Sequence, residues 1–348
     1  MKENKFDAKK SSLIFLLAFL IVQVVLSFWQ IILKTILTIF HYHDVDNFLS
    51  NPFLYMIFTL AQTLVFVGIF VFSLKNLNLK KEIKQKPLNW KLTLTFLVFG
   101  IITMFALSYF INFVTMALNL LHKPSTSIPY EINNWSSYLF SIVSLALLPA
   151  IGEELLFRAT IFNGLKSKGK LYAVIMSSVM FMIFHFNLSQ LYYPLLFGML
   201  LGIAYALTDS IIVPISMHFL NNALNITLQF ASNGSASSTK LYQVIIGVVI
   251  YLLILYVSLF IMDKKETQEQ IALVKQNNNQ KLPSSKETLN ELPSNNQSTT
   301  LTSINSVNKN TSSDTPFYKT DNFLTYLPFS LMVVIYIFLI FVWFLYKN

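Results

Sequence analysis

Residues 150–158 read AIGEELLFR, two adjacent acids and a base inside an otherwise apolar segment. From 137 to 165 the chain is almost all aliphatic residues and phenylalanine, and it is long enough to cross a bilayer as one helix. An ionisable group at that depth costs about 2.5–3.5 kcal/mol, so it indicates a functional site. Glu154 and Arg158 are four residues apart and can pair on one helix face. Glu153 lies about 100° away and is left without this partner.

The composition is that of a multi-pass membrane protein. Hydrophobic residues make up 54% of the 348 residues and charged residues only 12%, whereas soluble domains carry about 25% charged residues. The absence of cysteine excludes disulfides, thiolate metal sites and a cysteine nucleophile. The formal charge is +9, but the lysines gather in short segments between apolar runs, where they set membrane topology. We therefore expect no nucleic-acid partner.

The apolar runs predict an all-α, polytopic membrane helix bundle. Nine predicted spans occupy residues 13–40, 53–72, 92–120, 137–165, 171–186, 191–207, 211–230, 241–261 and 323–346. With this count the lysine-rich loops all fall on one side of the bilayer. The sequence therefore predicts a multi-pass protein of the cell membrane with a cytoplasmic N-terminus, in contact with lipid.

The same pattern predicts four parts. Residues 1–136 carry three spans, and residues 137–262 carry five, among them the span with the Glu pair. Asn, Ser, Thr, Gln and Lys dominate residues 263–322. Such a segment cannot bury enough apolar surface to offset its ordering entropy, so we predict a disordered linker. Residues 323–348 hold a C-terminal transmembrane helix.

Three further polar residues lie inside the spans. His218 and Asn222 are one helical turn apart, so they project from the same face. Counted at about 1.5 Å per residue from the inner ends of their spans, Glu153, His185 and His218 all lie toward mid-membrane. Helix tilt allows these side chains to share one cavity. Pro149 loosens the helix beside the Glu pair, which favours access of water.

These residue types support two chemical schemes. In the first, a carboxylate beside a histidine takes a proton from water, while a second histidine and an amide donate hydrogen bonds to an oxyanion. In the second, Glu153, His185 and His218 bind a divalent metal ion, zinc, with an open position for water. Both schemes lead to hydrolysis of an amide bond. The residue types alone do not choose between them, and no organic cofactor is indicated.

Each residue also has a structural interpretation. A buried Glu–Arg pair four residues apart is often purely structural, and an intramembrane His or Asn often joins two helices through a hydrogen bond. We expect Asn221 and Asn225 to be packing residues of this kind. Glu153, His185, His218 and Asn222, however, lie on three nearby spans at similar depth, and this joint occurrence favours a function.

Three motifs, in this order and at roughly this spacing, resemble those of the CAAX prenyl protease and bacteriocin-processing family (CPBP, or ABI). The motifs are Glu153-Glu154-x-x-x-Arg158, Phe181-x-x-x-His185 and His218-x-x-x-Asn222. The resemblance covers roughly residues 137–226. It implies an intramembrane endopeptidase with an eight-helix protease-like core. The linker and the ninth, C-terminal span depart from that pattern.

The resemblance also implies roles for the site residues. Glu153 and His185 would activate the attacking water, and His218 and Asn222 would stabilise the oxyanion. The buried acid–base pair, Glu154 with Arg158, would hold the site together. The family is commonly labelled metalloprotease, and a metal-free, glutamate-dependent mechanism is also argued for it. A zinc ion therefore stays an open alternative.

The leading hypothesis is an endopeptidase that cleaves a membrane-associated protein or peptide. The alternative is a non-catalytic membrane protein of the bacteriocin-immunity or protein-display type that binds a partner. A proton-coupled transporter is disfavoured because the chain shows no repeat of one half in the other. The sequence lacks a His-Glu-x-x-His run, a Gly-x-Ser-Gly motif and a pair of intramembrane aspartates, so other classes of intramembrane protease fit badly. The Asn- and Lys-rich linker and the absence of cysteine suggest a low-GC bacterium, in which we do not expect a prenylated CAAX substrate.

Overall fold

The computed structural model describes residues 5–83, 87–119, 130–185, 192–232 and 240–280. All regular structure in these ranges is helical, with no strand, which confirms the all-α prediction. The chain divides into a unit of residues 1–262 with 323–348 and a second unit of residues 263–322. The bundle described below belongs to the first unit.

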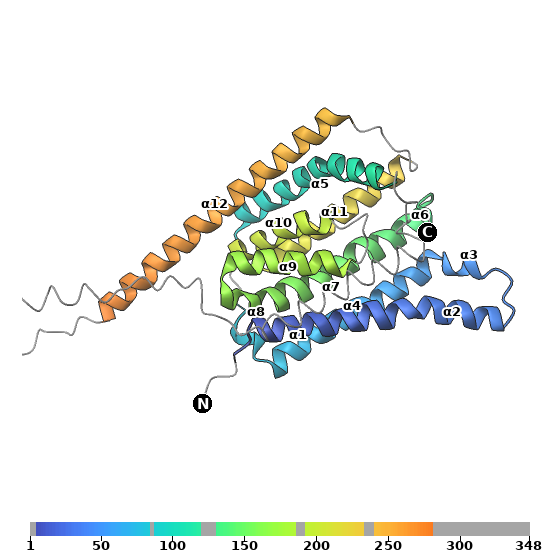
Figure 1. The fold of residues 1–348 in the computed structure, drawn as a ribbon, viewed down its shortest axis with the longest axis horizontal. Helices are drawn as coiled ribbons and strands as arrows, with labels where there is room; N and C mark the ends of the chain where they lie inside the picture. The colour runs from blue at the N-terminus through green and yellow to red at the C-terminus, as the bar shows by residue number, and fades with distance from the viewer. Residues whose placement is uncertain (1–4, 84–86, 120–129, 186–191, 233–239, 281–348) are drawn as a thin grey trace, which may run out of the picture. The chain divides into compact units, whose positions relative to one another are not determined.

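The helices follow one another along the chain (Figure 1). The first part comprises α1 (Ala8–Phe19), the π-helical η1 (Leu20–Leu26), α2 (Ser27–Ile39), α3 (Val45–Leu49), α4 (Pro52–Asn76), the 3-10 turn η2 (Leu79–Lys81) and α5 (Trp90–Asn119). One continuous stretch then comprises α6 (Trp135–Ser141), η3 (Ile142–Leu147), α7 (Leu148–Glu154), η4 (Leu155–Phe162), α8 (Asn163–Leu165) and η5 (Lys166–Lys168). The last helices are α9 (Lys170–Phe184), α10 (Tyr192–Thr208), α11 (Ile212–Ala231) and α12 (Leu241–Gln280).

Four of the described helical stretches are long and apolar enough to cross a membrane. They are Pro52–Asn76, Trp90–Met116, Trp135–Lys168 and Leu241–Gln276, and two shorter apolar helices are Lys170–Phe184 and Tyr192–Thr208. The structure is thus a polytopic helix bundle, as expected. The count of nine spans and the side of the N-terminus stay predictions. The ninth predicted span lies outside the described residues.

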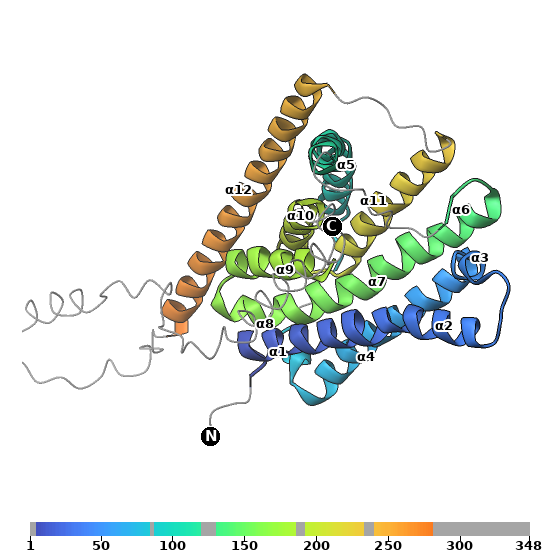
Figure 2. The ribbon, with the colours of Figure 1, turned by 45° about the vertical axis from the view of Figure 1, so that its right-hand side comes forward.

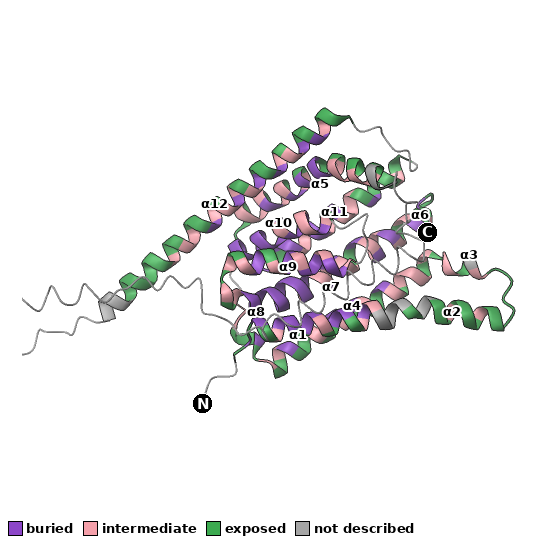
Figure 3. Ribbon diagram, in the orientation of Figure 1, coloured by how far each residue is buried: buried purple, intermediate pink, exposed green. Residues whose placement is uncertain are grey.

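The middle of the bundle is formed by the stretch from α7 to α8 together with α9, α10 and α11. Here α9 packs on α10, α11 packs on α5 and η3, and α4 packs on α7 and η4, an arrangement that can be followed in Figure 2. Figure 3 shows α8 and α10 mostly buried and α11 partly buried, whereas α2 is mostly exposed. Large apolar side chains such as Ile31, Phe72 and Leu94 stay exposed on the outer helices, which suits a surface in contact with lipid tails.

The beginning of the predicted linker differs from the prediction. Helix α12 continues beyond Met262 as far as Gln280 instead of ending at the membrane boundary. Residues 263–280 are rich in Lys, Glu and Gln and contain neither Gly nor Pro, so helix propensity favours continuation. Lys265 and Glu269 add an ion pair one turn apart, at 3.9 Å. The rest of the linker lies outside the described residues.

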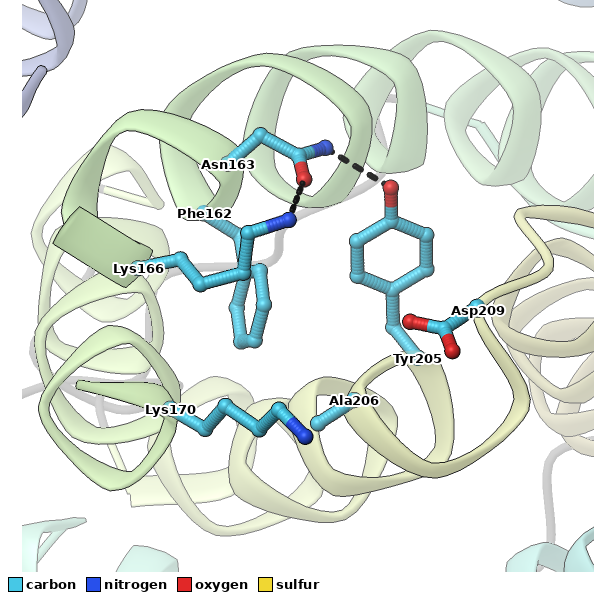
Figure 4. A pocket seen from close by; sticks show the side chains of 7 residues that line it. All are labelled: Phe162, Asn163, Lys166, Lys170, Tyr205, Ala206 and Asp209. Atoms are coloured by element: carbon cyan, nitrogen blue, oxygen red, sulfur yellow. Dashed lines mark hydrogen bonds between the residues drawn. The ribbon is translucent and has the colours of Figure 1, made fainter. Parts of the chain in front are cut away.

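A polar cluster fixes the end of the helical stretch that carries the Glu pair (Figure 4). The Asn163 amide donates to the Tyr205 hydroxyl of α10 at 2.7 Å. Lys166 Nζ donates to the Asn163 side-chain oxygen at 2.8 Å and to the carbonyl of Glu82 at 3.0 Å. These bonds join the C-terminal end of the stretch to α10 and to the chain after η2, so they limit rotation of the helix on which the site is built.

Candidate active site

The backbone is irregular on both sides of the acids. Helix α7 carries Pro149 in its first turn, and the π-helical stretches η3 and η4 flank it. Such π-helical turns are frequent at functional sites. Proline has no N–H, so residue 149 cannot donate an ordinary helical bond to the carbonyl of Leu145. Instead, Asn222 Nδ2 of α11 donates to that carbonyl at 3.0 Å. The proline thus prepares a docking point for one of the predicted site residues.

Gly152 lets α4 approach this irregular segment closely. A Cβ at this position would lie 3.0 Å from the ring of Phe66 and 3.2 Å from the Cα of Thr63. Thr63 Oγ1 also donates to the carbonyl of Leu148 at 3.1 Å. The contact between α4 and α7 therefore holds the segment before the two acids in place.

Glu154 and Arg158 form the predicted pair, and both are completely buried. Glu154 Oε1 accepts a hydrogen bond from Arg158 Nη1 at 2.9 Å and lies 2.9 Å from His218 Nδ1. Arg158 Nη2 donates to the carbonyl of Gly198 at 3.1 Å. The guanidinium carbon also lies 4.7 Å from the ring centroid of Phe181, a cation–π contact. One acid is thereby neutralised inside the bundle.

Glu153 has a different environment. Its side chain is 12% exposed and lines a cavity of about 610 Å³. Its Oε2 lies 3.9 Å from Nε2 of His218, which is longer than a direct hydrogen bond. His218 therefore stands between the acids, with Nδ1 at Glu154 and Nε2 toward Glu153. The acid that the helix geometry leaves without an arginine is the acid that faces the cavity.

His185 lines the same cavity from the end of α9. Its Nδ1 lies 2.9 Å from the carbonyl oxygen of Phe181, which can only accept, so Nδ1 carries the proton and Nε2 is the basic nitrogen. Among the described residues, His218 rather than His185 lies within 4 Å of Glu153. The structure thus brings Glu153 and both histidines to one cavity. The pairing of Glu153 with His185 stays a prediction.

A chain of hydrogen bonds holds Asn222 from the other side. Its Oδ1 accepts from Asn221 Nδ2 at 2.9 Å, and Asn221 Oδ1 accepts from the Tyr193 hydroxyl of α10. Asn222 lines the cavity together with His218. Asn221, expected only to pack, is 2% exposed and forms the middle of this chain. The sequence alone does not predict this role for Tyr193, because a tyrosine in an apolar helix is usually a core residue.

The donor set does not fit a three-ligand zinc site in this arrangement. Within the described ranges, no group of three or more His, Cys, Asp or Glu side chains is placed so that it could hold a metal ion. Glu153, His185 and His218 share a cavity, but Glu153 lies within 4 Å of His218 and not of His185. We therefore derive no step through a metal.

Residues 135–224 match a protein-family model described as type II CAAX prenyl endopeptidase, Rce1-like. The matched segment contains all three motifs, which confirms the resemblance to the CPBP family. It points to a membrane-embedded protease of the CAAX type. No curated protein and no solved structure matched the chain.

Proposed function

We propose that this protein is an intramembrane endopeptidase in which Glu153 activates a water molecule. The proposal rests on one observation: the adjacent acids Glu153 and Glu154 lie in contrasting environments. Glu154 is buried against Arg158, whereas Glu153 faces a cavity that it shares with two histidines. Paired titratable groups held in contrasting environments are typical of acid–base catalysis.

The proposed reaction consumes one water molecule. Glu153 accepts a proton as the water oxygen attacks the carbonyl carbon of the peptide bond. The tetrahedral intermediate collapses, the C–N bond breaks, and the proton passes from Glu153 to the leaving nitrogen. The products are a carboxylic acid and an amine, which exchange a proton to become a carboxylate and an ammonium group. His185 Nε2 is a second proton acceptor on the same cavity, because its Nδ1–H is held by a backbone carbonyl.

His218 is suited to stabilise the oxyanion. Its Nδ1–H donates to Glu154, so its Nε2 can donate only when the ring is protonated. The Glu154 carboxylate stabilises that imidazolium and fixes the ring orientation, as a second carboxylate does for a catalytic histidine. The Asn222 amide, one turn further along α11, supplies the second donor. The buried Glu–Arg pair therefore serves the chemistry through His218 as well as the fold.

A cellular experiment tests the function. Cells that lack the protein are complemented with wild type or with Glu153→Gln at matched abundance, and the peptide termini of membrane and secreted proteins are mapped by mass spectrometry. We expect termini that wild type restores and Glu153→Gln does not. If Glu153→Gln restores every phenotype and no terminus differs, the chain is a binding or immunity protein on a protease-like scaffold.

Tyr193→Phe tests the chain of hydrogen bonds behind Asn222. The ring stacks on Phe197 with centroids 5.5 Å apart, and phenylalanine keeps that stacking while it removes the hydroxyl. Loss of one hydrogen bond is worth about 1 kcal/mol, so we expect kcat to fall roughly five- to tenfold with KM unchanged. Tyr192→Phe, at the exposed neighbouring position, is the matched control. An equal effect of both variants, or a change in KM alone, would contradict a positioning role.

A further inference from the structure

A polar side chain reaches the cavity from the N-terminal helices, outside the segment that matches the family model. Gln23 is the only polar residue between positions 13 and 26. It lies in the π-helical turn η1, and such turns are frequent at functional sites. Its half-buried side chain lines the same cavity as Glu153 and His185. A polar residue inside an apolar helix usually serves a neighbouring helix or a functional site.

The Gln23 amide bonds to the peptide group that carries His185. Its Nε2 donates at 2.5 Å to the carbonyl of Phe184, the last residue of α9. Carbonyl groups in the last turn of a helix have no partner within that helix, and Gln23 supplies one for this carbonyl. The N–H of the same peptide group belongs to His185 and donates to the carbonyl of Met182 at 3.2 Å. Both sides of the peptide between Phe184 and His185 are therefore held.

A third hydrogen bond fixes the His185 ring itself. Its Nδ1 donates to the carbonyl of Phe181 at 2.9 Å, which leaves Nε2 as the nitrogen that acts in the cavity. The place of Nε2 thus depends on the backbone that Gln23 holds and on the ring bond to Phe181. Misplacing a reacting group by about 1 Å can lower a rate roughly 10²-fold, so such an anchor matters for a proton acceptor.

Contacts of α1 on both sides place Gln23. Phe19, one turn before Gln23, packs edge-on against Phe184 with ring centroids 6.1 Å apart. At the start of α1 the chain approaches α8 so closely that a Cβ on Gly164 would lie 2.6 Å from the carbonyl oxygen of Asp7. Helix α1 is therefore packed against the stretch with the Glu pair and against the end of α9.

We propose that Gln23 is a positioning residue of the active site: it holds the peptide before His185 and thereby sets the place of His185 Nε2 in the cavity. The N-terminal helix thus completes a site whose acids and histidines all lie in the matched segment. This inference rests on the proposed function, in which the positioned ring accepts a proton.

Gln23→Met keeps the length of the side chain and removes the donor. The full-length variant in lipid nanodiscs is incubated with membrane proteins extracted from cells that lack the protein, and the appearance of new peptide termini is followed by mass spectrometry. We expect termini to appear about five- to tenfold more slowly than with wild type, the effect of losing one hydrogen bond.

Tyr251→Phe is the matched control. The Tyr251 hydroxyl of α12 donates to the carbonyl of Leu196 in α10 at 3.0 Å, so this variant also removes a bond from a side chain to the backbone of another helix. Neither residue lines the cavity. We expect Tyr251→Phe to produce termini at the wild-type rate.

A chemical measurement reports the placement of His185 without any need for activity. Diethyl pyrocarbonate acylates the unprotonated ring nitrogen of histidine, and its rate at His185 is measured relative to the exposed His43. We expect Gln23→Met to raise this relative rate several-fold, because the ring is held less firmly, and Tyr251→Phe to leave it unchanged. If Gln23→Met does not accumulate, Gln23→Asn, whose amide is one methylene shorter, takes its place in both measurements.

The outcomes separate the two proposals. A relative rate at His185 that does not rise in Gln23→Met, cleavage by this variant at the wild-type rate, or an equal loss in Tyr251→Phe would overturn the inference and leave the endopeptidase proposal intact. If wild type produces no termini that Glu153→Gln fails to produce, the endopeptidase proposal fails, and the rate at His185 still decides whether Gln23 holds that ring.

Discussion

Glu153→Gln is expected to lower the rate of peptide hydrolysis by about 10²–10⁴-fold, the usual contribution of a general base. The amide keeps the volume of the side chain and cannot accept the proton of water. Folding should change little, because the nearest potential ion-pair partner of Glu153 among the described residues, His218 Nε2, lies 3.9 Å away and the carboxylate makes no tight ion pair. The measurement is kcat of the purified protein in nanodiscs, together with its melting temperature.

The matched control is Glu131→Gln, which removes an acid at an exposed position outside the cavity. We expect it to retain wild-type activity, which separates loss of a base from a general change in surface charge. Glu153→Gln with more than about a tenth of wild-type kcat would show that Glu153 is not the base. A large fall in melting temperature would instead assign it a structural role.

Which of the two acids pairs with Arg158 could be predicted, because this pairing depends on local helix geometry alone. A spacing of four residues places Glu154 beside Arg158 on any helix, and the adjacent Glu153 must then point elsewhere. The π-helical turns around α7 do not disturb this relation: the pair closes at 2.9 Å. The shared cavity could also be predicted by counting residues along each span, because the depth of a residue in the membrane changes by about 1.5 Å per residue along a helix.

The partner of each histidine could not be predicted in this way. Which side chain lies beside Glu153 depends on how α9 and α11 are rotated about their own axes, and the packing of neighbouring helices sets that rotation. In the structure α11 turns His218 between the two acids, while the end of α9 ties His185 to a carbonyl of its own helix. The role of Tyr193 could not be predicted either, because its partner Asn221 lies on another helix and their contact depends on how the two helices pack.

The start of the linker shows a different limit. The composition predicts that residues 263–322 cannot form a hydrophobic core. It does not predict whether part of this segment extends a neighbouring helix, because such an extension needs no core of its own. Once α12 has been nucleated by its apolar part, each added residue costs little. Lysine, glutamate and glutamine then propagate the helix to Gln280.

Arg158→Ala is expected to destabilise the protein by about 3–5 kcal/mol, because it leaves the buried carboxylate of Glu154 without its counter-charge. It also removes the donor to the carbonyl of Gly198 and the cation over Phe181. We expect a sharply lower abundance in membranes and a lower melting temperature, whereas Lys91→Ala, near the exposed Trp90, should behave as wild type.

A double variant separates the fold from the chemistry. Replacing both members of the pair, Glu154→Leu with Arg158→Leu, removes the unpaired charge, and buried ion pairs are often replaced by apolar residues at little cost. We expect abundance to recover toward wild type. Activity should stay low, because His218 Nδ1 has lost the carboxylate that stabilises its charged form. Full activity in the double variant would mean that the pair supports only the fold, and wild-type stability of Arg158→Ala would mean that the pair does not support the fold.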